Sequence, residues 1–329
     1  MESTQTKTPI FLPRPGLSGG HRQTLASFFL GRRIGLPPAE ARLIEVEPGV
    51  KVLAHCHWQT DRENALTVIV VHGLEGSSDS QYMLGIAAKG LALGINVVRM
   101  NQRNCGGTEA LAPTLYHSGR SPDVAAVARN LIDQDHISRL ALVGFSMGGN
   151  LVLKLAGEWG SSGPVQFRAV AAVCPAVDLA ASADALHLRS NRLYEEYFLW
   201  KLKGRLRSKA KLFPGAFDTS RLRGIGTLRD FDDRITAYYC GFAGAADYYD
   251  RAAATHVVDR IAVPAFILHA ANDPFIRILP ETREKFLNNP HITFLETEDG
   301  GHCSFLSVAN CDDGHWAEIQ ILEFLRRFM

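Results

Sequence analysis

The sequence predicts an α/β fold in which a mostly parallel sheet is covered by helices on both faces. Continuous apolar runs rich in β-branched residues, such as residues 66–71, are typical of strands that helices bury on both sides. Such runs alternate with helical segments along the chain, which indicates right-handed strand–helix–strand crossovers. The alternation stops between residues 176 and 258, where aromatic residues are frequent and no buried strand is evident. We therefore expect one large domain interrupted by a helical insertion.

The expected elements follow one another in a regular order. Residues 9–38 are rich in Pro and Gly and are expected to form an ordered arm. Residues 42–46 and 51–58 alternate in polarity, as paired antiparallel strands do. Ser121 is expected to be the N-cap of a helix that has Pro122 at its first position. Buried strands are expected at 66–71, 95–100, 139–143, 167–174, 263–269 and 291–296, and helices at 81–93, 122–133, 149–156 and 315–328.

These elements divide the chain into three predicted parts. The arm comprises residues 1–38, the α/β core comprises residues 39–175 and 259–329, and residues 176–258 form a helical cap. Within the cap, apolar residues recur four positions apart and give one stripe of an amphipathic helix. The members of this stripe are Phe198, Leu202, Leu206 and Ala210.

Bulk properties exclude several classes of protein. The chain has 35 basic and 34 acidic residues and a net charge of +1, so charge gives no case for nucleic-acid binding. No apolar run approaches the roughly 18 residues that a membrane span needs. The first eight residues lack the basic and apolar stretches of a signal peptide. The six scattered cysteines are typical of free thiols in a reducing compartment, so we expect a cytoplasmic protein.

The segment 144–148 has the pattern G-x-S-x-G and directly follows an expected buried strand. In that context Ser146 lies at the tip of a sharp strand-to-helix turn, where its hydroxyl is exposed to a substrate. The start of the helix directs free N–H groups toward it, which stabilises negative charge nearby. We predict that Ser146 is a nucleophile; the alternative is a purely structural glycine turn.

A serine hydroxyl needs a base to remove its proton and a third group to orient that base. Asp273 ends the next strand after the cap, where functional groups gather in open α/β sheets. His302 follows the last strand behind two glycines. We predict His302 as the general base and Asp273 as its orienting partner. The rivals are His315 for the base and Asp178 for the acid, and Asp273 could instead cap the next helix.

The oxyanion of a tetrahedral intermediate needs preorganised N–H donors. One predicted donor is the backbone N–H of Met147, immediately after the nucleophile. The other is the backbone N–H of Leu74, in the loop that follows strand 66–71. The alternative is that His72 and Gly73 form only a turn at the end of that strand.

Several motifs together resemble the YheT-like branch of the α/β-hydrolase superfamily. They lie at residues 20–25, 72–77, 103–107, 116–119, 144–149, 231–237, 241–242, 247–249, 272–275 and 300–302, and the resemblance runs from about residue 11 to the C-terminus. The resemblance implies an α/β-hydrolase fold with an eight-stranded sheet, a helical cap and a triad of Ser146, Asp273 and His302. It also implies acyl-ester hydrolysis, with acyl transfer to alcohols or cleavage of lipid acyl groups in eukaryotic relatives. Residues 103–107 (RNCGG) depart from the expected R-G-C-S-G-like turn.

Other clusters have simpler interpretations. The basic run 201–211 is expected to be a solvated face of the cap helix, and docking on an anionic lipid surface is the alternative. His55 and His57 share one strand face but lack further ligands, so we predict no metal. Cys303 is expected to be a packing residue and not a second nucleophile. Asp232 and Asp233 are expected to serve as an N-cap or in cap salt bridges, without a catalytic role.

We therefore predict a serine hydrolase of carboxylic esters, without cofactor or metal. The aromatic cap favours a small-molecule ester with a hydrophobic acyl group of medium length, and we expect a cavity lined by Met83, Met147 and cap aromatics. The alternatives are an acyltransferase that uses the same acyl-enzyme, a peptidase, and a non-catalytic binding protein on the same scaffold.

Overall fold

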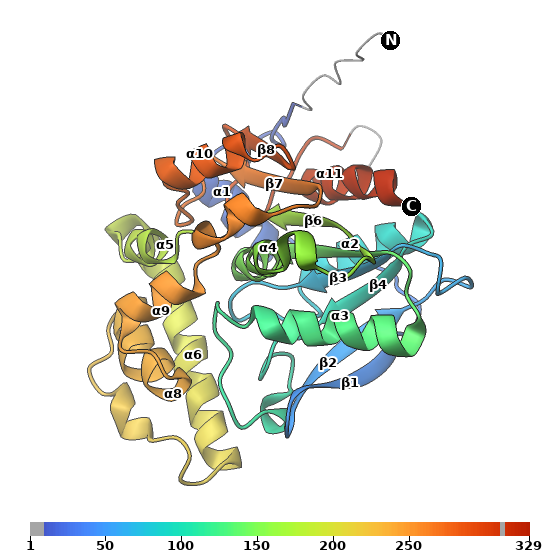
Figure 1. Cartoon of the computed structure of the whole chain (residues 1–329). Helices are drawn as coiled ribbons and strands as arrows, with labels where there is room; N and C mark the ends of the chain where they lie inside the picture. Colours follow the sequence, from blue (N-terminus) through green and yellow to red (C-terminus); the bar gives the residue numbers. More distant parts are fainter. Residues whose placement is uncertain (1–9, 310–312) are drawn as a thin grey trace.

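A single eight-stranded sheet organises the computed structural model, which describes residues 10–309 and 313–329. The strands lie in the order β1-β2-β4-β3-β5-β6-β7-β8 (Figure 1). β1 (Glu40–Glu47) pairs antiparallel with β2 (Val50–His57), and β2 pairs antiparallel with β4. The six parallel strands are β3 (Thr67–Val71), β4 (Asn96–Met100), β5 (Leu140–Phe145), β6 (Phe167–Val173), β7 (Ala265–Ala270) and β8 (Ile292–Thr297). The predicted mostly parallel sheet is confirmed.

Helices cover both faces of the sheet because alternate side chains of each buried strand are apolar on both sides. Buried side chains of α3, α4 and α10 pack on one face, and those of α2 and α11 pack on the other. The helices outside the β6–β7 connection are α1 (Gly20–Phe29), α2 (Gln81–Ala92), α3 (Ser121–Asp135), α4 (Met147–Trp159), α10 (Pro280–Asn288) and α11 (Trp316–Leu325). Among the described residues, no helix is both long and apolar enough to cross a membrane.

The start of α3 differs from the prediction by one residue. Ser121 is the first residue of the helix and not its N-cap, although Pro122 does lie in the first turn. The Ser121 hydroxyl donates 2.7 Å to the Glu158 carboxylate on α4, so it joins two helices instead of capping one.

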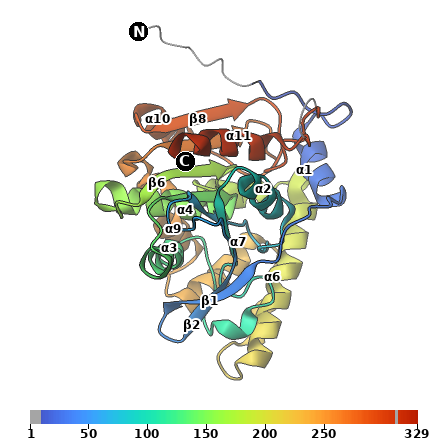
Figure 2. The ribbon, with the colours of Figure 1, turned by 90° about the vertical axis from the view of Figure 1, so that its right-hand side faces the viewer.

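Residues 176–258, which lie between β6 and β7, form helices joined by loops and turns, contain no strand, and are called here the β6–β7 segment. Its buried side chains pack against residues from the loops that follow β4, β5 and β7, including Cys105, Met147 and Phe275. The segment therefore lies over the carboxyl ends of the parallel strands (Figures 1 and 2). Its α-helices are α5 (Leu179–Leu186), α6 (Arg192–Leu212), α7 (Leu228–Phe231), α8 (Tyr238–Cys240) and α9 (Ala245–Ala252), with a π-helical turn at Asp232–Ala237.

The basic run on α6 is not a solvated face, so that prediction is wrong for two of its members. Lys209 is fully buried and its ammonium donates to the carbonyls of Glu109 and Ala112. Arg205 is also turned inward, toward Glu75. Four residues apart, Arg205 and Lys209 share one face of α6. The acceptors on that face come from loops about 100 residues earlier in the chain, which local patterning could not reveal.

The arm predicted at residues 1–38 contains the helix α1, and residues 1–9 lie outside the described part of the chain. Gln23 on α1 is buried and bonds the backbone of Leu306 twice, as donor at 3.0 Å and as acceptor at 2.8 Å. These paired bonds attach the arm to the loop that carries His302.

Candidate active site

Ser146 lies at the turn between β5 and α4, in a strained backbone conformation. Its φ of 54° and ψ of −120° are rare for a residue with a side chain. The Ser146 N–H donates 2.9 Å to Val173 O on β6, and its carbonyl accepts from Ala176 N at 3.2 Å. These bonds to the neighbouring strand and its loop hold the turn in place and leave the hydroxyl half-buried at the sheet edge.

Glycines on both sides allow this turn to form. A Cβ at Gly144 would overlap the Gly148 carbonyl, and a Cβ at Gly148 would overlap the carbonyl of Val71 on β3. The strand and the helix therefore approach too closely for any side chain at either position, as the G-x-S-x-G pattern predicts.

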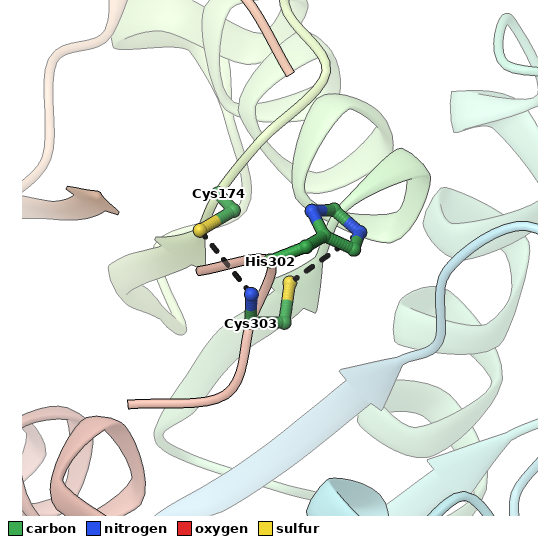
Figure 3. Close-up of side chains that lie close together, drawn as sticks. All are labelled: Cys174, His302 and Cys303. Atoms are coloured by element: carbon green, nitrogen blue, oxygen red, sulfur yellow. Dashed lines mark hydrogen bonds between the residues drawn. The ribbon is translucent and has the colours of Figure 1, made fainter. Parts of the chain in front are cut away.

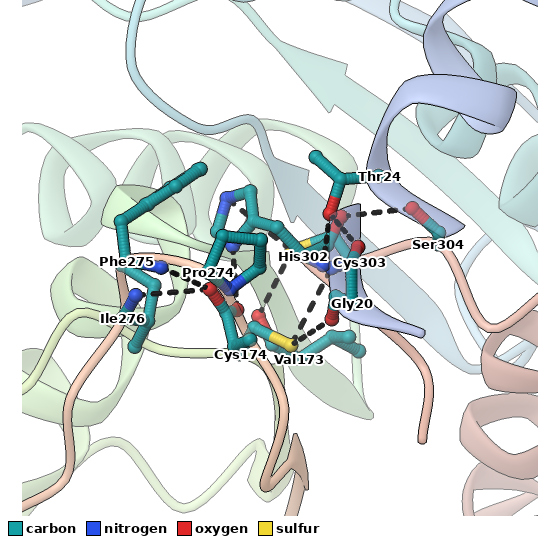
Figure 4. Close-up of polar contacts among 12 residues, drawn as sticks. Gly20, Thr24, Val173, Cys174, Pro274, Phe275, Ile276, His302, Cys303 and Ser304 are labelled. Atoms are coloured by element: carbon teal, nitrogen blue, oxygen red, sulfur yellow. Dashed lines mark hydrogen bonds and ion pairs between the residues drawn. The ribbon is translucent and has the colours of Figure 1, made fainter. Parts of the chain in front are cut away.

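Asp273 and His302, predicted as partners, lie together at the ends of β7 and β8. The His302 Nδ1 and Asp273 Oδ2 atoms are 2.8 Å apart (Figure 4). Asp273 Oδ1 accepts from the backbone N–H groups of Phe275 and Ile276 at 3.0 and 2.9 Å. Burial alone would raise the pKa of Asp273, but His302 and these donors outweigh it and lower the pKa. Asp273 is thus a buried carboxylate aimed at the imidazole.

The rival residues lie elsewhere. The Asp178 carboxylate accepts from Leu279 N and from Thr282 Oγ1, both at 2.8 Å, and so holds the start of α10. His315 is the residue before α11, and its N–H is bonded to Asp313 at 3.2 Å. Neither makes a hydrogen bond to Ser146, Asp273 or His302 within the described ranges, so the geometry favours Asp273 and His302.

The other nitrogen of His302 faces Cys303 and not Ser146. His302 Nε2 is 3.9 Å from Cys303 Sγ (Figure 3). No hydrogen bond joins Ser146 Oγ to the imidazole in the described chain. The N–H of Cys303 points to Cys174 Sγ at 3.4 Å. The structure therefore brings Asp273 and His302 together but leaves the serine–histidine contact open, as is common in sites without substrate.

Charges couple His302 to Cys303. Burial alone would lower the pKa of His302, but the Cys303 thiolate and the Asp273 carboxylate outweigh it and raise the pKa. Burial alone would raise the pKa of Cys303, but the hydrogen bond with Cys174 and the charge of His302 lower it. Cys303 is thus an electrostatic partner of the imidazole. The sequence offered only its position beside His302 as a signal.

The two predicted oxyanion donors, Leu74 and Met147, line one cavity with Ser146. Gly73 N–H is already committed to Tyr82 Oη at 3.0 Å, whereas Leu74 N–H has no hydrogen bond within the described residues. Met147 is the first residue of α4, so its N–H has no partner inside the helix. Both amides are therefore available to a ligand.

A buried ion pair anchors the loop that carries Leu74. Glu75 follows Leu74 directly and has φ 55°. Its carboxylate accepts two bonds of 2.8 Å from the guanidinium of Arg205 on α6, and the two side chains are only 2% and 11% exposed. The Tyr116 hydroxyl adds a bond of 2.6 Å to the same carboxylate. The β6–β7 segment is thereby attached to the loop next to the nucleophile.

The cavity beside Ser146 has about 920 Å³ of empty space, part of it open to solvent, and is largely apolar. Its aromatic walls come from the β6–β7 segment, from Tyr116 in the loop between β4 and α3, and from Phe275. Met147 lines it as expected, but Met83 does not, because that side chain is fully buried between α2 and the sheet. The aromatic lining residues are Tyr116, Phe198, Phe231, Tyr248, Tyr249 and Phe275.

The acid pair at 232–233 divides between two environments. Asp233 accepts from Ala245 N at 3.0 Å at the start of α9, a capping role that was expected. Asp232 forms no ion pair among the described residues and instead lines the cavity with Ser146, so the expected cap salt bridge is wrong for it. The π-helical turn, which the sequence did not predict, turns Asp232 inward.

Two overlapping clusters contain residue types that could bind a metal ion. Their ligand atoms lie within 4.8 Å of one another, and both include Cys174, with His302 and Cys303 in one and His269 and Asp273 in the other. Asp273 and His302 already bond each other in this arrangement. The absence of a metal or cofactor stays a prediction.

Comparisons with known proteins match this geometry. A family model described as alpha/beta hydrolase fold matches residues 67–307. The YheT protein of Escherichia coli (strain K12) is 30% identical over 325 residues, covering 97% of this chain and 94% of the relative. Medium-chain fatty acid ethyl ester synthase/esterase 2 of Saccharomyces cerevisiae is 26% identical over 309 residues, covering 86% and 67%. The solved esterase Pf2001 of Pyrococcus furiosus shares the fold, with a TM-score of 0.59, 18% identity, and coverage of 97% and 98%.

The ion pair between Glu75 and Arg205 gives a stability prediction. Arg205→Met should lower the free energy of unfolding by about 3–5 kcal/mol, because it leaves Glu75 buried and unpaired. The double variant with Glu75→Gln should lose less than the sum of the single losses. Denaturant unfolding measures both. Arg207→Met, an exposed neighbour on α6, should stay within about 0.5 kcal/mol of the parent. Additive losses would show that the two charges are not coupled.

The contact between Cys303 and His302 gives a pH prediction. His302 must be neutral to accept the serine proton, so kcat/KM should rise with pH through its pKa. Cys303→Ser removes the thiolate that helps to raise this pKa, so the midpoint of the rise should move to lower pH. Cys240→Ser, which changes a thiol in α8, should leave the midpoint in place. The pH profile of ester hydrolysis measures the shift, and an unmoved midpoint in Cys303→Ser would contradict the coupling.

Proposed function

The chain belongs to the YheT-like branch of the α/β-hydrolase family and is a carboxylic ester hydrolase, and we propose that it works through an acyl-enzyme on Ser146. The observation that carries this proposal is the convergence of the strained Ser146 turn with the Asp273–His302 pair at the carboxyl ends of β5, β7 and β8. The Ser146 N–H and the thiol of Cys303, next to His302, both bond Val173 O on β6, so the serine turn and the pair lie beside each other, as the proposed roles require.

In the proposed mechanism, His302 takes the Ser146 proton as Oγ attacks the ester carbonyl. Asp273 holds the proton of Nδ1 and stabilises the charged imidazole. The N–H groups of Leu74 and Met147 stabilise the oxyanion, at roughly 3–4 kcal/mol for one donor. His302 then protonates the departing alcohol, and a water molecule resolves the acyl-enzyme. The Nε2 atom must exchange its contact with Cys303 for one with Ser146 when substrate binds.

We propose that the substrate carries a hydrophobic acyl group of medium length. The cavity that begins at Ser146 is walled by leucines and aromatic rings, and each buried methylene of a chain contributes about 0.8 kcal/mol there. The β6–β7 segment supplies most of that wall, and we propose that residues 176–258 are a cap on a core formed by residues 39–175 and 259–329.

A second candidate function is acyl transfer to an alcohol. It uses the same acyl-enzyme, and the yeast relative is named as both a synthase and an esterase. The two outcomes differ only in whether water or an alcohol attacks the acyl group.

One assay tests both functions. Hydrolysis of p-nitrophenyl esters from acetyl to palmitoyl should peak at a middle chain length and fall at least 10³-fold in Ser146→Ala, because the nucleophile is lost. Ser138→Ala is a matched control, since that exposed hydroxyl lies just before β5, at the opposite end of the strand from Ser146. Added ethanol should yield ethyl esters if transfer competes with hydrolysis. Activity that survives in Ser146→Ala would overturn the mechanism.

We also propose a cytoplasmic protein that contacts lipid surfaces peripherally. The five cysteines within the described ranges are free thiols, and Cys311 lies outside those ranges. Because the basic run turns inward at Arg205 and Lys209, an exposed aromatic patch is the better lipid contact. The patch joins α1 to α6, and Phe28 and Tyr197 have ring centroids 5.5 Å apart. Its members are Phe28, Phe29, Leu193, Tyr197 and Trp200.

Cell fractionation tests this proposal. Most of the protein should be cytoplasmic, with a minor fraction that stays on membranes in high salt, because salt screens charges and does not weaken an apolar contact. The Phe28→Ser/Phe29→Ser double variant should reduce the membrane fraction severalfold, since these rings are 59% and 74% exposed and make up much of the patch. Leu287→Ser on α10, at 73% exposure, is the control. Equal membrane fractions in both variants would remove the patch from consideration.

A further inference from the structure

Asp232 is a charged side chain placed in an apolar cavity without a compensating charge. It is 8% exposed and lines the cavity that begins at Ser146. Arg205 is the other residue of the described cavity wall that is charged at every ordinary pH. Its charge is compensated by Glu75. The charge of Arg229 acts on Asp232 without an ion pair, because its guanidinium bonds Asp184 at 2.6 Å and lies over the ring of Tyr249. Within the described ranges, no cation forms an ion pair with Asp232.

Two hydroxyls hold this carboxylate in a fixed orientation. Thr236 Oγ1 donates to Oδ1 and Tyr249 Oη donates to Oδ2, both at 2.7 Å. A carboxylate can accept about four hydrogen bonds, so each oxygen keeps acceptor capacity. Both donors also line the cavity, which places the unused capacity at its wall. Burial raises the pKa of Asp232 to about 6, so the group is mainly ionised at neutral pH.

The backbone here is also unusual. Residues Asp232–Ala237 form a π-helical turn between α7 and α8. Such turns are rare and frequently occur at functional sites, because the extra residue in the turn redirects side chains. In this chain it brings Asp232 and Thr236 to the cavity, while Asp233 stays outside to cap α9.

We propose that Asp232 forms a subsite for a hydroxyl group carried by the acyl chain, so that preferred substrates are esters of hydroxy acids whose hydroxyl lies remote from the carbonyl. A single hydroxyl needs one acceptor, which Asp232 supplies, and the rest of such a chain matches the apolar wall. An ammonium group has three donors and a large desolvation cost, and the wall offers it only one carboxylate. This proposal rests on the acyl-enzyme function assigned to Ser146.

The test compares matched esters. The wild-type protein is assayed with p-nitrophenyl hexanoate, octanoate and decanoate and with their ω-hydroxy derivatives, which place the hydroxyl at three reaches. At the length that reaches Asp232, the hydroxy ester should be preferred by about tenfold or more in kcat/KM, because a hydrogen bond to a charged group is stronger than one to water or a neutral acceptor. No preference at any length would overturn the subsite.

Two variants separate recognition from structure. Asp232→Asn should lower kcat/KM for the preferred hydroxy ester about tenfold and leave the plain esters within about threefold. Asp233→Asn makes the same chemical change at the neighbouring capping position and should alter neither. An equal loss on both ester types in Asp232→Asn would show a structural role only. An ω-amino ester preferred over the hydroxy ester would overturn the assigned ligand class.

Two further measurements keep the proposal testable. If Asp232→Asn does not fold, the affinities of the wild-type protein for ω-hydroxydecanoate and for decanoate can be compared by calorimetry. The hydroxy acid should bind more tightly, and equal affinities would overturn the subsite. Plain-ester hydrolysis that depends on Ser146 reports the proposed function by itself. Its loss would therefore be distinguishable from the loss of hydroxyl preference.

Discussion

The strained turn at Ser146 is the constraint on which the rest of the structure depends. A serine at φ 54° costs on the order of 1–3 kcal/mol, so its surroundings must hold it there. β6 does so through Val173 O, and the first residues of the β6–β7 segment do so through Ala176 N. The same turn brings α4 so close to the ends of β5 and β3 that positions 144 and 148 exclude side chains. The segment that walls the cavity therefore begins with a hydrogen bond to the serine itself, which fixes its helices beside the nucleophile.

Local patterns predicted the sheet and the pairing of Asp273 with His302, because both follow from where the strands lie and end. Buried strands such as β3 are continuous apolar runs, and Asp273 and His302 could be placed from the strands that precede them. The predictions that were wrong concern residues whose partners are distant in the sequence. Arg205 and Lys209 look like solvated helix residues until loops about 100 residues earlier supply their acceptors. Met83 packs between α2 and the sheet and not in the cavity, since its helix position says nothing of which layer it faces. Patterns of apolar residues reveal the helical period of about 3.6 residues and the strand period of two. A π-helical turn follows neither period, so the turn that moves Asp232 inward gave no signal.

Two buried acids near the cavity are stabilised in different ways, and the difference separates structure from recognition. Glu75 receives a bidentate guanidinium and a tyrosine hydroxyl, so its charge is compensated and its acceptors are largely used. Removing one member of such a pair is costly, which suits a residue that attaches the β6–β7 segment to the loop after β3. Asp232 receives only two neutral hydroxyls and keeps both its charge and spare acceptor sites at the cavity wall. The two hydroxyl bonds of Asp232 stabilise the packing of the helices by less than the burial of its charge costs. A contact with a ligand would account for a buried charge at this position.

The position of His302 depends on contacts from the N-terminal arm and from the β6–β7 segment. Its loop contains Gly300, Gly301 and Cys303 at positive φ, so the loop has little conformational preference of its own for this shape. The arm supplies one support, because Thr24 Oγ1 on α1 accepts the His302 N–H at 2.9 Å (Figure 4). The β6–β7 segment supplies the other, because the Tyr194 ring of α6 packs on Phe275, whose centroid is 4.3 Å from the imidazole. His21 of α1 connects these two supports, because its Nδ1 lies 3.1 Å from the Tyr194 hydroxyl of α6. The arm is thus part of the framework that orients the base, and a disturbance of either α1 or α6 is transmitted to the same imidazole.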